Sequence, residues 1–125
     1  MTIRQAPRPR DGAYLGFIAE TRDTLHAVGY DPKDGRTTTA TKENINDPET
    51  RLQALSELTR FLQRRVQGTR PIDLYVDDRA MVEHLRDLSQ TEHGAVCVHK
   101  IERRENPARQ QPRNRSRRIE WSSPT

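Results

Sequence analysis

One stretch near the middle of the chain repeats large apolar residues at helical spacing. The stripe consists of Leu52, Leu55, Leu58, Leu62 and Val66. Asp47 stands before Pro48 and is a good N-cap, because its carboxylate accepts a backbone N–H that the first turn leaves without a partner. Gly68 suits the position after the last turn. The pattern predicts an amphipathic helix that packs on a sheet.

Five segments of the chain predict strands. Residues 12–20 are apolar on both faces, which is typical of a central strand. Residues 24–30 form a second segment with an alternating pattern. Residues 36–42 contain four threonines, which are β-branched but too polar for the centre of a sheet, so they predict an edge strand. Residues 71–76 and 95–101 supply two more short strands.

A second helix is expected between the last two strands, capped by Asp77 or Asp78. Its buried stripe consists of Met81, Val82, Leu85 and Leu88. Hairpins join the first three strands, and right-handed crossovers join the others. The sequence therefore predicts an α/β fold with two helices and a mixed five-stranded sheet of order 3-2-1-4-5, with strands numbered along the chain.

The two ends of the chain differ from its middle in charge. Residues 1–11 contain three arginines and one aspartate, and residues 103–125 contain seven arginines and two glutamates. The whole chain has 22 basic and 18 acidic residues, so residues 12–102 contain 12 basic and 15 acidic residues and are net negative. We expect a flexible basic arm over 1–11, an anionic folded domain over 12–102 and a disordered arginine-rich tail over 103–125.

Several classes of protein are disfavoured by the sequence. No apolar run approaches the roughly 20 residues of a membrane span, and the N-terminus lacks the apolar core of a signal peptide. The single cysteine excludes an internal disulfide. Cys97 and His99 share one strand face, which is more typical of a packed pair than of a zinc site. We expect a cytoplasmic protein with no membrane partner.

The basic tail indicates salt-dependent contact with nucleic acid, with RNA or an RNA–DNA hybrid favoured. The candidate contacts are Arg103, Arg104, Arg109, Arg113, Arg115, Arg117, Arg118 and Trp121, whose indole is suited to stack on a base. Alternatively the tail only solubilises the protein, and Trp121 docks on its own domain or on a partner. Arg60, Arg64 and Arg65 either extend a phosphate-facing surface or form a solvated helix face.

The element order and two local motifs resemble the ribonuclease H-like fold over roughly residues 12–108. Residues 72–82, Ile-Asp-Leu-Tyr-Val-Asp-Asp-Arg-Ala-Met-Val, look like the fourth strand of that family, which ends in a metal-binding aspartate. Residues 98–108 look like its last strand and the segment before the final acidic residue. Here Arg109 follows Ala108 where that acid is expected.

The resemblance implies a set of metal-binding carboxylates. Asp77 takes the role of the acid after the fourth strand, and Glu20 and Glu49 are the candidates for the first strand and the first helix. Asp77 and Glu20 would then hold Mg²⁺. The topology also brings Glu20 and Asp77 to one sheet edge, where open α/β sheets bind ligands. Each acid has a local explanation too, as a helix cap, a favourable dipole charge or a solvated turn residue.

We therefore expect a nucleic-acid-binding ribonuclease H-like domain with reduced or no catalysis, which needs no cofactor. One alternative is a Mg²⁺-dependent ribonuclease H-type endonuclease that uses Glu20, Glu49 and Asp77. Another is a protein-interaction module of a larger assembly.

Overall fold

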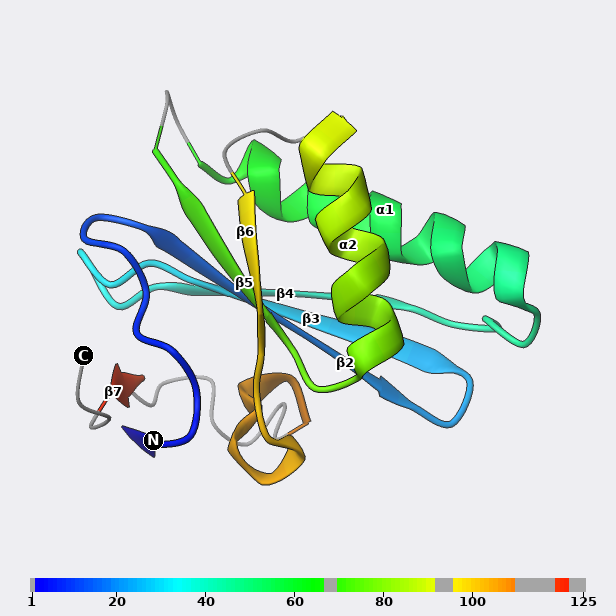
Figure 1. Cartoon of the computed structure of the whole chain (residues 1–125), viewed down its shortest axis with the longest axis horizontal. Coiled ribbons are helices and arrows are strands. Elements are labelled where there is room, and N and C mark those ends of the chain that lie inside the picture. The colour runs from blue at the N-terminus through cyan, green and yellow to red at the C-terminus, as the bar shows by residue number, and fades with distance from the viewer. Residues whose placement is uncertain (1, 67–69, 92–95, 110–118, 122–125) are drawn as a thin grey trace.

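The computed structural model describes residues 2–66, 70–91, 96–109 and 119–121. A mixed five-stranded sheet forms its centre (Figure 1). Its strands are β2 (Tyr14–Thr21), β3 (Thr24–Tyr30), β4 (Thr37–Lys42), β5 (Ile72–Val76) and β6 (Val96–Lys100). Strands β2, β3 and β4 are successively antiparallel, whereas β2, β5 and β6 are parallel. The predicted α/β class, with a mixed five-stranded sheet and two helices, is confirmed.

The strand order is β4-β3-β2-β5-β6. It differs from the predicted 3-2-1-4-5 in its numbering, because a short strand β1 (Thr2–Ile3) that the sequence did not predict precedes the others. Central strand β2 lies beside β5, with Ile18 opposite Val76. The carboxyl ends of these two strands therefore meet at one edge of the sheet, as expected.

Helices α1 (Pro48–Arg64) and α2 (Arg79–Thr91) cover one face of the sheet (Figure 1). The carboxylate of Asp47 caps α1 by accepting the backbone N–H of Thr50 at 3.0 Å. Leu55, Leu58 and Leu62 are buried, but Leu52 is 42% exposed and is not part of the core. Leu52 lies at the side of the stripe, because Ala54 and Thr59 complete the buried face instead. Gly68, expected to end this helix, lies outside the described residues.

The two ends of the chain cover the opposite face. Residues 2–11 were expected to form a flexible arm, but they pack on the sheet with Ile3 and Ala6 buried. Strand β1 pairs in parallel with β7 (Glu120–Trp121). Two 3-10 turns, η1 (Arg103–Glu105) and η2 (Pro107–Arg109), follow β6, so the domain extends beyond the predicted boundary at 102.

The reason for this second layer is the central strand itself. Leu15, Phe17 and Ala19 face away from the helices and are fully buried. Apolar residues on both faces of a strand need cover on both sides. The two helices supply one cover, and the chain ends supply the other. No helix among the described residues is long and apolar enough to cross a membrane.

Candidate functional site

Asp77 follows β5 directly and is the most buried acid at the sheet edge. Its side chain is 1% exposed. Arg109 donates to both of its carboxylate oxygens, from Nε at 2.6 Å and from an Nη nitrogen at 3.0 Å. Such a bidentate pair combines charge with fixed geometry. Asp77 is therefore neutralised by a cation from its own chain.

Asn106 positions the turn that carries Arg109. Its side chain is completely buried. The Nδ2 group donates to the backbone oxygen of Ile18 and to the Asp77 carboxylate, each at 3.0 Å, while Oδ1 accepts the N–H of Ala108 at 3.0 Å. One amide thus joins β2, the end of β5 and η2, and it directs Arg109 toward Asp77.

Glu20 lies at the end of β2 and pairs with another arginine. Its Oε1 is 2.7 Å from Nε of Arg51, an ion pair whose angles do not align for a hydrogen bond. The negative charge of Glu20 also acts on Arg109. The hydrogen bond to Asp77 is the main cause that raises the pKa of Arg109, and the charges of Glu20 and Asp78 act in the same direction. The two predicted acids thus share an edge, but arginines lie among them.

Glu49 and Asp78 have local roles. Glu49 is exposed in the first turn of α1, and no described contact joins it to Glu20 or Asp77. The Asp78 carboxylate accepts the N–H groups of Ala80 at 2.9 Å and Met81 at 3.2 Å, so Asp78, not Asp77, caps α2. The structure therefore does not assemble the predicted catalytic set of Glu20, Glu49 and Asp77 around one point.

These residues do not fit a divalent cation. Within the part of the chain that the structure describes, no group of three or more His, Cys, Asp or Glu residues is placed to hold a metal ion. Both oxygens of Asp77 already accept hydrogen bonds from Arg109. A Mg²⁺ ion requires several oxygen ligands in near-octahedral geometry, and a guanidinium at this distance would repel it.

The predicted nucleic-acid contacts in the tail fall into three groups. Arg103 and Arg104 are exposed on η1. Arg109 is directed inward to Asp77. The Trp121 indole donates to the backbone oxygen of Ala6 at 3.2 Å and stacks on the ring of Phe17, with 6.3 Å between the ring centroids. Trp121 is therefore docked on its own domain. Arg113, Arg115, Arg117 and Arg118 lie outside the described residues.

A second buried acid was missed from the sequence. Asp73, in the middle of β5, has a fully buried side chain. Its carboxylate accepts the backbone N–H of Arg10 at 2.8 Å and is 2.8 Å from Nε2 of His99. The only sequence signal was a charged residue inside an otherwise apolar strand. The predicted packing of His99 thus has a polar partner, and this partner also fastens the N-terminal segment.

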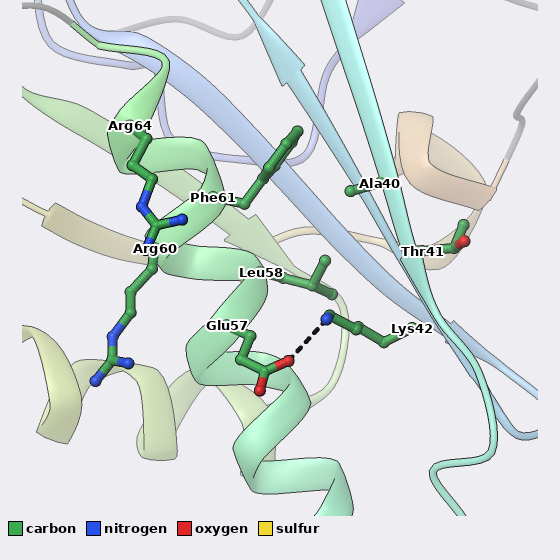
Figure 2. A pocket seen from close by; sticks show the side chains of 8 residues that line it. All are labelled: Ala40, Thr41, Lys42, Glu57, Leu58, Arg60, Phe61 and Arg64. Carbon is green, nitrogen blue, oxygen red and sulfur yellow. Dashed lines mark ion pairs between the residues drawn. The ribbon is translucent and has the colours of Figure 1, made fainter.

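A basic groove runs between edge strand β4 and helix α1, and Figure 2 shows the side chains that line it. Its volume is about 460 Å³. Leu58 and Phe61 point toward β4, and Arg60 and Arg64 extend along one side of α1 (Figure 2). Lys42 lies across the groove with Nζ 2.7 Å from the Glu57 carboxylate. Three cations and one acid give the groove a net positive charge.

No protein-family model matches this sequence, and the search of curated proteins finds no match either.

Proposed function

We propose that this chain is a cytoplasmic nucleic-acid-binding protein of the ribonuclease H-like type in which catalysis is reduced or absent. RNA or an RNA–DNA hybrid is the favoured partner. The mixed sheet, with its two central parallel strands ending side by side, supports the choice of fold type. It is the site chemistry, however, that supports a binding role over an enzymatic one.

The bidentate pair of Arg109 and Asp77 is the observation that carries this proposal. Metal-dependent phosphodiester cleavage needs carboxylates that are open to divalent cations. Here Asp77 is buried with a guanidinium 2.6 Å away, and Glu20 pairs with Arg51. Arg109 and Arg51 neutralise the negative charges of these carboxylates, which a metal ion would neutralise in an enzyme. We infer that the edge has a structural role in holding the C-terminal turn.

Binding is assigned to the basic groove and to the tail. The groove presents Arg60 and Arg64 to phosphates, while Lys42 is paired with Glu57, and the half-buried ring of Phe61 is part of its lining. A cationic groove with an aromatic side chain is a common way to bind a single strand without strong sequence preference. The arginines of 103–125 add charge that does not depend on base sequence.

The salt dependence of binding tests this assignment. The full chain is titrated with a labelled single-stranded RNA and with an RNA–DNA hybrid over a series of salt concentrations. The groove variant R60Q/R64Q should weaken binding and lower the salt slope by about 0.7 to 0.9 for each phosphate that the variant no longer neutralises. The matched control R4Q/K100Q removes the same charge from exposed positions outside the groove and should leave the slope unchanged.

The contribution of the tail is measured in the same way. Because Trp121 is packed on the domain, the tail is neutralised rather than deleted, in the variant R113Q/R115Q/R117Q/R118Q. We expect a further decrease in slope, by several units if all four arginines bind phosphates. If neither the groove nor the tail variant changes affinity, the proposal fails, and binding to acidic proteins becomes the function to test.

A further inference from the structure

A second basic recess lies at the end of the sheet opposite to Asp77. It has a volume of about 510 Å³, and it is formed by the start of β2, the β3–β4 turn, the start of β4, the C-cap of α1 and Arg70, two residues before β5. The lining side chains are Tyr14, Asp31, Lys33, Asp34, Arg36, Thr38, Arg65 and Arg70. Four of them are cationic and two are acidic.

The floor of the recess is formed by the hydroxyl groups of Tyr14 and Thr38, and the Tyr14 ring lies against Gly29. A Cβ atom at Gly29 would lie 2.3 Å from the Tyr14 hydroxyl, so only glycine leaves room for this ring. The Tyr14 hydroxyl is hydrogen-bonded to the side chain of Thr38, and burial raises the pKa of Tyr14. The phenol therefore stays protonated at neutral pH.

One wall of the recess is rigid. Arg70 donates to both carboxylate oxygens of Asp31, at 2.8 and 2.6 Å, and to the backbone oxygen of Gly12 at 2.6 Å. Its side chain is only 17% exposed. This pair is neutral in sum and fixes the β3–β4 turn against the start of β5. It shapes the recess but contributes little net charge.

The net charge comes from the rim. Arg65 lines the recess, and its guanidinium lies over the Phe61 ring, 5.0 Å from the ring centroid. Lys33 and Arg36 are exposed on the turn, and the Asp34 carboxylate is 3.7 Å from Nε of Arg36. Asp31 is paired with Arg70, and Asp34 is paired with Arg36. The positive charges of Lys33 and Arg65 remain, so the recess carries a net positive charge of two. That charge matches a dianion.

We propose that this recess binds the phosphoryl group of a phosphate monoester, with Arg65 and Lys33 as its cationic contacts and the Tyr14–Thr38 hydroxyl pair at its floor. A phosphoryl dianion has the charge to complement the two cations and the acceptor oxygens that guanidinium and ammonium groups prefer. The proposal does not depend on the function assigned to the groove and tail, because it rests on other residues at another end of the sheet.

The test is a titration of the full chain with inorganic phosphate at constant ionic strength, followed by the amide resonances of Gly29 and Thr38. We expect saturable shifts and a dissociation constant that rises about tenfold in R65Q, the change expected when one charged hydrogen bond is removed. K33Q should act in the same direction. The control is K100Q, which removes one positive charge from an exposed position that lines neither the groove nor this recess.

Two outcomes would overturn the proposal. Shifts that grow linearly with phosphate and never saturate would mean general charge screening. Equal weakening in K100Q and R65Q would mean that net charge, not this recess, attracts the ion. A final comparison identifies the source of the phosphoryl group. Tighter binding of a 5′-phosphorylated oligothymidylate than of its 5′-hydroxyl form assigns a strand end, whereas preference for adenosine monophosphate over both assigns a small monoester.

Discussion

At the scale of single residues, the same acid that resembles a catalytic aspartate has a structural role. Asp77 stands where the family resemblance places a metal ligand, but a guanidinium and an amide occupy its oxygens. A buried carboxylate needs a compensating charge, and here Arg109 of the same chain supplies it. The sequence showed the acid. It did not show that Arg109, 32 residues further along the chain, is the partner.

Removal of Arg109 should therefore destabilise the fold. R109A leaves the Asp77 carboxylate buried without its cation, and we expect the free energy of unfolding to fall by about 3 kcal/mol. The measurement is urea unfolding at pH 7. R103A, on exposed η1, should stay within about 0.5 kcal/mol of the natural protein.

The pair can be separated from simple loss of packing. In D77N/R109Q both charges are removed, and the double variant should be more stable than the sum of the two single changes predicts. Additive effects, or an R109A as mild as R103A, would contradict a buried ion pair at this edge.

Asp73 predicts a dependence of stability on pH. Burial alone would raise the pKa of this carboxyl, but the hydrogen bonds from His99 and from the Arg10 backbone outweigh burial and hold the pKa below its ordinary value of 3.8. A group with a lowered folded-state pKa contributes stability above its unfolded pKa and loses it as the pH falls through the folded value. The natural protein should therefore lose stability below about pH 4.

The variant D73N isolates this contribution. It should be less stable than the natural protein at pH 7 and should lose less stability between pH 7 and pH 3, as measured by urea unfolding at each pH. D11N makes the same substitution at an exposed site and should keep the full acid loss. An unchanged acid loss in D73N would refute the assignment.

At the scale of elements, the periodic spacing of apolar residues predicted the helices and the long strands. Leu55, Leu58 and Leu62 predicted the first helix, and apolar residues on both faces of residues 12–20 predicted a central strand, which the structure forms as β2. The N-terminal segment was missed because Ile3 and Ala6 are isolated among arginine, glutamine and proline, so no period marks them. Their burial depends on contacts with β7, more than 100 residues away in the chain, and no local pattern encodes such contacts.

The pairing of β1 with β7 gives an element-scale prediction. Trp121, the only tryptophan of the chain, reports on this layer because it packs between the chain ends and Phe17. I3A should destabilise the protein by about 2 to 4 kcal/mol through the cavity that it leaves, and it should shift the Trp121 emission toward the red. Neighbouring Thr2 is exposed, so T2A should change neither quantity. A red shift in both variants, or in neither, would contradict the packed layer.

At the scale of the whole molecule, positive charge is collected at separate places on a domain whose middle is net negative. The groove beside β4, the recess at the start of β2 and the tail each present several cations, whereas the arginines at the Asp77 edge are paired inward. This distribution supports nucleic-acid binding in which affinity falls steeply with salt. These cationic places lie apart from the edge at which the family resemblance would put metal ions.

The central claim is that the protein binds nucleic acid without cutting it. The most direct measurement is incubation of a labelled RNA–DNA hybrid with the full chain in Mg²⁺ and in Mn²⁺, analysed on a native gel for binding and on a denaturing gel for cleavage. We predict a retarded complex whose strands stay intact. Cleavage of the RNA strand that the variant D77N abolishes, or the absence of any complex at low salt, would contradict the account.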